Sequence, residues 1–130
     1  MLVDGYPVHN PRSLVREGAR IVLRVEAPLR GEVKLRAALG AFGVDVESRI
    51  ALDLGAAAGG FTRVLLDSGA SRVYAVDAGY GQLLGSLRQD PRVVVLERLN
   101  LGDLDPSQIP EAVDLITIDL SYLSLSQAFP

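Results

Sequence analysis

One stretch, residues 50–62, constrains the fold of this chain more than any other. It reads I-A-L-D-L-G-A-A-A-G-G-F-T: a short apolar run that ends at Asp53 and Leu54, a turn of Gly and Ala, and a second apolar run at helical spacing. This order predicts a strand, a tight loop and the first turn of a helix. Such a junction directs backbone N–H groups and the positive end of a helix dipole at one point. We therefore expect it to bind a polar or anionic part of a ligand.

Strands and helices alternate along the rest of the chain. The apolar pattern predicts strands over 72–76, 93–96 and 113–118 and an irregular or single-turn element over 106–110. It also predicts a short helix over 83–87 and a helix that stops near Gly69 and is lined by Phe61, Val64, Leu65 and Leu66. Before the central stretch, a helix over 32–42 is expected to place Val33, Leu35, Ala38, Leu39 and Phe42 on one face. The alternation predicts an α/β fold with a parallel, Rossmann-like sheet. The near-continuous apolar run at 113–118 predicts a strand that is buried on both faces.

The N-terminal end differs from this body in charge and pattern. Residues 2–8 predict a strand or a hairpin that turns at Asp4-Gly5, and residues 20–25 predict another short strand. Residues 1–36 carry seven Lys or Arg against four Asp or Glu, whereas residues 37–130 carry six against twelve. The basic end is either a segment that faces phosphate groups or a solvated basic surface.

Composition excludes several classes of function. The 130 residues include no cysteine and the single histidine His9, so no thiolate nucleophile and no metal site are expected. No run approaches the ~18 apolar residues of a membrane span, and no signal peptide is evident. We expect a soluble, cytoplasmic protein without a membrane partner.

Three carboxylates are candidates for a ligand site. Asp53, Asp77 and Asp119 each close a predicted strand, so they are expected to crowd the same edge of the sheet. Asp77 follows Asp53 by 24 residues, close to the ~20 residues that separate a nucleotide-binding loop from the acid that holds ribose hydroxyls. Asp77 is therefore the predicted ribose ligand, with a helix cap or a loop residue as the alternative for each acid.

Two cofactor classes compete for the central loop. A dinucleotide fingerprint requires glycine at its first, third and sixth positions, and here Gly55 and Gly60 fit but Ala57 does not. An acid two positions before the first glycine, as Asp53 stands before Gly55, is typical of loops that bind S-adenosylmethionine. The loop therefore favours S-adenosylmethionine over a dinucleotide.

Five motifs in register resemble the hemolysin A, or TlyA-type, family of ribosomal RNA 2′-O-methyltransferases in the FtsJ-like group. They are D-L-G-A-A-A-G-G-F-T, V-Y-A-V-D-A-G-Y-G-Q-L, L-R-Q-D-P-R-V, E-R-L-N and D-L-S-Y-L-S. The resemblance implies that residues 1–27 are the closing β part of a small ribosomal-protein-type RNA-binding domain. It implies that residues 28–130 are the first part of an FtsJ-like methyltransferase domain, with ribosomal RNA as its partner.

The resemblance also assigns roles to residues. Lys34, which its spacing alone marks as a solvated lysine, maps onto the first lysine of the family's Lys-Asp-Lys-Glu catalytic set, and Asp119 maps onto its Asp. Lys34 would activate a ribose hydroxyl while Asp119 orients Lys34 and the ribose. The cofactor S-adenosyl-L-methionine would be bound by the following residues: Asp53, Gly55, Ala56, Gly59, Gly60, Asp77 and Asn100.

Departures from the family pattern leave alternatives open. Glu32 replaces a glycine beside Lys34 and is expected either to pair with Lys34 or to repel RNA phosphate, and Ala57 and Ala58 replace Ser and Thr. The second Lys and the Glu of the catalytic set would lie beyond Pro130. We therefore expect methylation by the full-length protein, little or none by this chain alone, and an open sheet edge at 113–118.

Rival functions are a non-catalytic RNA-binding or cofactor-binding module and an NAD-linked oxidoreductase. A third is the pore formation that the hemolysin name suggests, which no amphipathic or membrane-spanning stretch supports.

Overall fold

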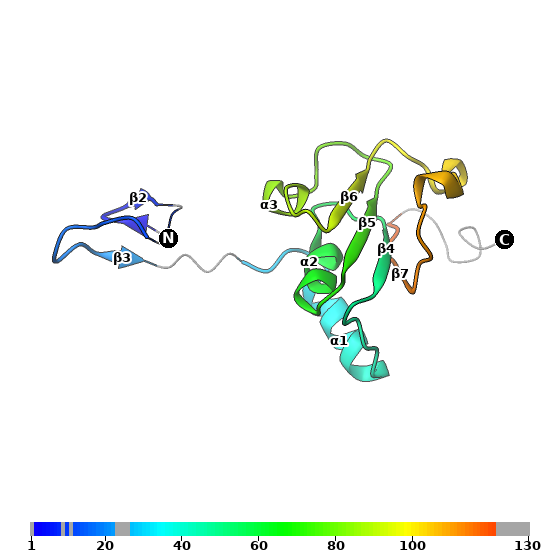
Figure 1. The fold of residues 1–130 in the computed structure, drawn as a ribbon, viewed down its shortest axis with the longest axis horizontal. Coiled ribbons are helices and arrows are strands. Elements are labelled where there is room, and N and C mark those ends of the chain that lie inside the picture. The colour runs from blue at the N-terminus through cyan, green and yellow to red at the C-terminus, as the bar shows by residue number, and fades with distance from the viewer. Residues whose placement is uncertain (1, 9, 11, 23–26, 122–130) are drawn as a thin grey trace.

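The computed structural model of the chain describes residues 2–8, 10, 12–22 and 27–121. Its body is a four-stranded parallel sheet in the order β6-β5-β4-β7, with helices before and between the strands (Figure 1). The elements of the body are α1 (Glu32–Phe42), β4 (Ile50–Leu54), α2 (Gly60–Asp67), β5 (Arg72–Val76), α3 (Gly85–Arg88), β6 (Val93–Leu96), η1 (Leu101–Asp103), η2 (Pro106–Gln108) and β7 (Leu115–Ile118). The predicted α/β class, and the parallel sheet within it, are confirmed.

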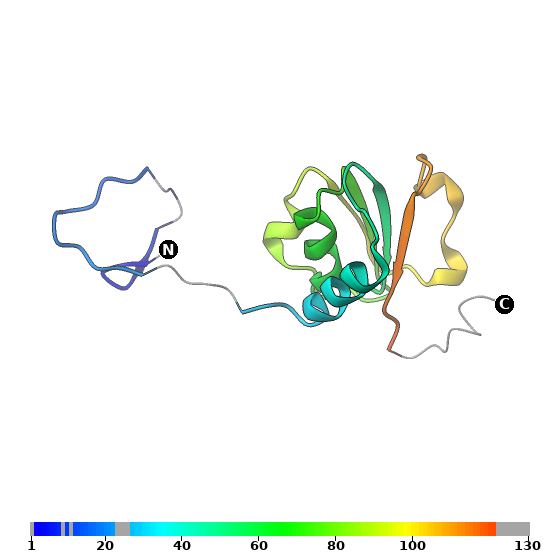
Figure 2. The same ribbon diagram turned by 90° about the horizontal axis from the view of Figure 1, so that it is seen from below.

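Each face of the sheet has its own apolar core. One core packs α1, α2 and α3 against the sheet through side chains such as Leu35, Leu65 and Leu87. The other core, centred on Leu52 and Tyr74, is covered by the segment that carries η1 and η2 (yellow to orange in Figure 2). The central strands β4 and β5 are buried from both sides because helices cover one face and this segment covers the other.

Two predictions about burial are wrong. In α1, Val33 and Phe42 are 71% and 81% exposed, and the buried positions of the helix are Glu32 and Leu35. In β7, which forms one edge among the described strands, Ile116 is 50% exposed. The predicted edge position of this strand is confirmed, but its expected burial on both faces is not, because at Ile116 the sheet face stays open to solvent.

The N-terminal segment forms a separate three-stranded antiparallel sheet in the order β2-β1-β3. Its strands are β1 (Leu2–Val3), β2 (Tyr6–Pro7) and β3 (Ile21–Val22). The predicted hairpin turns at Asp4 and Gly5, both with positive φ. The Asp4 carboxylate accepts hydrogen bonds from the Arg20 N–H at 3.0 Å and from the Arg16 guanidinium at 3.0 Å. This sheet is held by local polar contacts, since Ile21 and Val22 are largely exposed.

His9 and residues 23–25 of the strand expected over 20–25 lie outside the described residues, as do residues 122–124 of the last motif. Among the helices of the described part, none is long and apolar enough to cross a membrane.

Candidate functional site

The order in which successive parallel strands are added to the sheet reverses at β4. The chain leaves β4 for β5 and β6 on one side, then returns to place β7 on the other side of β4. In open parallel sheets ligands bind at the carboxyl ends of the strands at this topological switch point. The loop that begins at Gly55 and the residue Asp119 follow the two strands that meet there.

Two adjoining cavities of about 230 and 510 Å³ open at this point and share five lining residues. We call them together the switch-point cleft; the shared lining residues are Gly55, Ala57, Gln82, Asp119 and Ser121. Ala56, Ala58, Gly60 and Arg30 line the smaller cavity only. Asp77 and Asn100 line the larger cavity only. The cleft is large enough for part of a nucleoside-containing ligand.

The loop from Gly55 to Gly59 follows a path that bulkier residues would block. Gly55 has φ +87°, and a Cβ placed on it would collide with the backbone carbonyl oxygen of Asp119. The loop is further fixed by N–H groups of Gly55 and Ala56, which both donate to the Val76 carbonyl oxygen at 2.9 and 3.1 Å. Gly59 is the N-cap residue of α2 and is buried. Glycine at position 55 therefore lets the loop lie directly against the end of β7.

Asp53 is placed differently from the expectation. Its side chain is completely buried and lines neither cavity, because Asp53 precedes the last residue of β4 and points into the core beneath the loop. It accepts hydrogen bonds from the hydroxyls of Thr62 in α2 at 2.7 Å and Thr117 in β7 at 3.0 Å. Burial raises its pKa to about 6, against the lowering effect of these hydrogen bonds. The predicted crowding of three acids at one edge holds for Asp77 and Asp119 only.

Asp77 directly follows β5 and is half-buried at the edge of the larger cavity. One carboxylate oxygen accepts the N–H of Ala57 at 2.8 Å, and the other accepts the N–H of Gly79 at 2.7 Å. These two hydrogen bonds orient the carboxylate between the central loop and the loop after β5. Asn100, at the N-cap of η1, is exposed in the same cavity.

Lys34 and Asp119 meet at the cleft although they lie 85 positions apart. The Lys34 Nζ donates to Asp119 Oδ1 at 2.8 Å and lies 5.8 Å from the centre of the Phe61 ring. The two side chains are 66% and 42% exposed, so this ion pair contributes little to stability. Lys34 is the single lysine of the chain, beside twelve arginines. The structure thus brings together the two residues for which a catalytic role is predicted.

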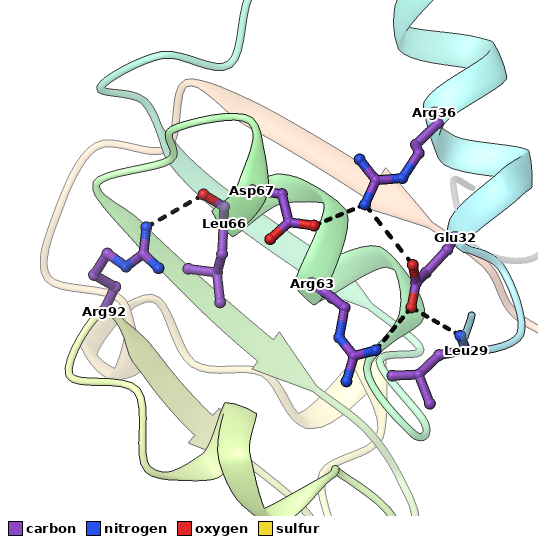
Figure 3. A network of polar contacts seen from close by, with 7 residues as sticks. All are labelled: Leu29, Glu32, Arg36, Arg63, Leu66, Asp67 and Arg92. Atoms are coloured by element: carbon purple, nitrogen blue, oxygen red, sulfur yellow. Dashed lines mark hydrogen bonds and ion pairs between the residues drawn. The ribbon is translucent and has the colours of Figure 1, made fainter. Parts of the chain in front are cut away.

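Glu32 pairs with other groups than the expected Lys34. Its carboxylate accepts hydrogen bonds from the N–H of Leu29 at 2.8 Å and from the guanidinium of Arg63 at 3.1 Å (Figure 3). Arg36 also approaches it, at 3.8 Å. The expected pairing with Lys34 is wrong because Glu32 lies on the buried side of α1.

Four residues at or beneath the cleft were not predicted from the sequence: Thr62, Thr117, Gln82 and Ser121. Thr62 and Thr117 are ordinary helix and strand residues in sequence, and only the fold shows that both face Asp53. Gln82 and Ser121 lie inside two of the quoted motifs, which was the available indication that they line the cleft.

Comparisons with known proteins agree with this geometry. The family model for FtsJ-like methyltransferases matches residues 28–130. The chain is 47% identical over 132 residues to the Mycobacterium tuberculosis 16S/23S rRNA (cytidine-2′-O)-methyltransferase TlyA, covering 98% of this chain and 49% of that protein. It is 35% identical over 133 residues to hemolysin A of Brachyspira hyodysenteriae, covering 100% of this chain and 55% of that protein.

Solved structures show the same likeness in three dimensions. A Streptococcus thermophilus protein that carries the hemolysin name superposes with a TM-score of 0.76 and 40% identity, covering 82% of this chain and 39% of that one. The chain spans about half the length of the curated relatives it matches. Because the family model matches residues 28–130 and the relatives are similar over the same residues, the chain belongs to the FtsJ-like methyltransferase family.

Proposed function

We propose that the switch-point cleft binds S-adenosyl-L-methionine and that the protein methylates ribose 2′-hydroxyls of ribosomal RNA. The observation that carries this proposal is the Lys34–Asp119 pair, held at 2.8 Å where Asp119 lines both cavities. The names of the relatives support it, since TlyA of Mycobacterium tuberculosis is a 16S/23S rRNA (cytidine-2′-O)-methyltransferase.

The residues of the cleft fit this cofactor. Asp77 is oriented by two backbone N–H groups and lines the larger cavity, so its carboxylate suits the hydroxyls of the cofactor's ribose. The small residues Gly55, Ala56 and Gly60 line the smaller cavity and leave room for the methionine part, and Asn100 suits an edge of the adenine. Gly59, also predicted to bind the cofactor, lines neither cavity and lies against Leu83 and Leu87. Asp53 does not contact the ligand in this proposal. Its hydrogen bonds with Thr62 and Thr117 connect β4 to α2 and β7 beneath the loop and so hold the loop in position.

The chemistry assigned to the chain's own residues is activation of a weak nucleophile. S-adenosylmethionine, when bound, would supply an electrophilic methyl group, and its methyl–sulfur bond would break to leave the neutral thioether of S-adenosylhomocysteine. The positive charge of the Lys34 ammonium lowers the pKa of a ribose hydroxyl beside it, and the Asp119 carboxylate holds Lys34 in place and accepts the proton that the hydroxyl loses. The hydroxyl oxygen gains the methyl group as it loses this proton. The two side chains also align that oxygen with the methyl group, and this orientation contributes further to the rate enhancement.

The division into domains follows from the same proposal. Residues 28–130 contain the cleft and form the cofactor-binding part of a methyltransferase domain. Residues 1–27 form the closing β part of a small RNA-binding domain, in which Arg16 and Arg20 add to the basic character of the N-terminal end. A ribosomal RNA substrate places the protein in the cytoplasm.

Titration calorimetry tests the cofactor. We expect one molecule of S-adenosylmethionine to bind per chain, and Asp77→Ala to weaken binding by at least ten-fold, which corresponds to the loss of hydrogen bonds to a charged group. Asp45→Ala removes an exposed carboxylate from the loop after α1 and serves as the matched control with unchanged affinity. Binding of NADH in preference to S-adenosylmethionine would favour an oxidoreductase and refute the proposal.

A further inference from the structure

A largely buried ion pair joins the first turn of α1 to the first turn of α2. The side chain of Glu32 is 8% exposed and that of Arg63 is 18% exposed, and their closest atoms lie 3.1 Å apart. The same Glu32 oxygen accepts the N–H of Leu29, so one carboxylate joins the segment that enters α1 to the helix that follows the central loop (Figure 3).

The backbones of the two helix starts also touch. A Cβ on Gly60 would collide with the backbone carbonyl oxygen of Arg30. A Cβ on Gly31 would lie 3.1 Å from the Phe61 ring, which is the ring that lies beneath the Lys34 ammonium. The segment 30–32 therefore rests directly on Gly60 and Phe61, and its position depends on the end of the cofactor loop.

Lys34 lies two residues after Glu32, in the same helical turn. Its side chain is largely exposed and donates a hydrogen bond to Asp119, which lines the cleft. The direction of the Lys34 side chain therefore depends on the position of the first turn of α1. A long exposed lysine has many rotamers, and an ion pair with 66% and 42% exposure does not by itself select one of them.

We propose that Glu32 and Arg63 are positioning residues that hold Lys34 against Asp119 and link the geometry of the 55–59 loop to this pair. The consequence for catalysis rests on the proposed function of Lys34, whereas the placement of Lys34 does not. A buried ion pair often adds little net stability, because desolvation of both charges offsets their attraction. Its value here is the fixed geometry that it gives to the start of α1.

The single lysine makes the placement directly measurable. The chain labelled with [15N]lysine gives one side-chain Nζ signal, and in Asp119→Asn this signal reports a Lys34 without its carboxylate partner. We expect Glu32→Ala and Arg63→Ala each to move the signal toward its position in Asp119→Asn, and the double variant to move it by less than the sum of the two single shifts, because the two residues share the contact at 3.1 Å. Arg63→Lys, which keeps the charge, is expected to restore most of the wild-type signal.

The matched control is Asp67→Ala. It removes the exposed outer ion pair between the same two helices, in which Arg36 and Asp67 approach to 2.7 Å. This variant is expected to leave the Lys34 signal unchanged. An unchanged signal in Arg63→Ala, in a chain whose backbone amide spectrum remains that of the wild type, would overturn the proposal. So would an equal shift in Asp67→Ala.

Activity gives a second readout in the protein expressed from its complete natural reading frame. Arg63→Ala is expected to lower kcat for methyl transfer by about ten- to a hundred-fold with the KM for S-adenosylmethionine unchanged, the range expected when a reacting group is misplaced by about 1 Å. If Lys34→Ala leaves methyl transfer intact, the proposed function fails, while the Nζ signal still decides whether Glu32 and Arg63 position Lys34.

Discussion

Replacement of Asp53 by Asn isolates the energetic effect of the buried carboxylate beneath the cofactor loop. Asp53 has no solvent exposure, and burial raises its pKa from 3.8 to about 6. A raised pKa in the folded state means that folding favours the protonated acid. The pH-dependent contribution of Asp53 to the free energy of unfolding is therefore fully present below pH 3.8 and is lost as the pH rises through about 6.

The size of this effect follows from the shift. About two pKa units at 1.36 kcal/mol each give about 3 kcal/mol, most of which is lost between pH 4 and 7. The amide side chain of the Asp53→Asn variant does not titrate. The free energy of unfolding of Asp53→Asn minus that of the wild type is therefore expected to rise by roughly 2 to 3 kcal/mol over this interval.

Urea unfolding of both proteins at half-unit steps of pH measures this difference. Carboxylates that do not interact with Asp53 contribute equally to both proteins and cancel. Asp105→Asn is the control of opposite sign, since hydrogen bonds from Ser107 lower the pKa of Asp105 and its stabilisation is lost as the pH falls. A difference between Asp53→Asn and the wild type that stays constant from pH 4 to 7 would refute the assignment of a raised pKa to Asp53.

Three further predictions concern the cleft and the core. Lys34→Ala is expected to abolish methyl transfer but to leave the calorimetric affinity for S-adenosylmethionine within about two-fold, because Lys34 lines neither cavity and acts on the RNA hydroxyl. Gly55→Ala places a methyl group against the carbonyl of Asp119 at φ +87° and is expected to destabilise the fold by about 2 kcal/mol or more in urea unfolding and to abolish cofactor binding. Tyr74→Phe removes the hydrogen bond from the buried Tyr74 hydroxyl to Glu111 and is expected to cost about 1 kcal/mol in the same assay; no loss would mean that this bond adds no net stability.

The strands were the most predictable part of the fold. Apolar runs bounded by Gly, Asp and Pro predicted the extents of β4, β5 and β6, because each run is short and its side chains pack into the two cores. The parallel order followed from alternation with helices. The start and end of α1 were also predicted, since Gly31 and Gly43 adopt the left-handed conformation at its two ends.

Which side chains of a helix or strand are buried was less predictable than the extent of the element. The spacing of Val33 and Phe42 fits a helix face, yet both are exposed, because α1 is placed by Leu35 and by the polar contact of Glu32 with Arg63. A single sequence contains no signal for an ion pair between residues 31 positions apart. The same holds for Asp53, whose hydroxyl partners come from two other elements.

The site was predictable where strand ends determine it. Asp77 and Asp119 follow strands directly, so the parallel sheet brings them to one edge. Asp53 precedes the last residue of its strand, and the alternation of side chains turns it into the core. The approach of Lys34 to Asp119 required the family resemblance, because nothing in the pattern of α1 indicates where its exposed side chains project.

The most direct test of the proposed chemistry is the position of the methyl group on treated RNA. Ribosomal RNA is incubated with S-adenosylmethionine and the protein expressed from its complete natural reading frame, then digested to nucleosides and analysed by mass spectrometry. We expect 2′-O-methylated nucleosides with the wild type and none above background with Lys34→Ala. Methyl groups on the bases, or 2′-O-methylation by Lys34→Ala at the wild-type rate, would contradict the role given to Lys34 and Asp119.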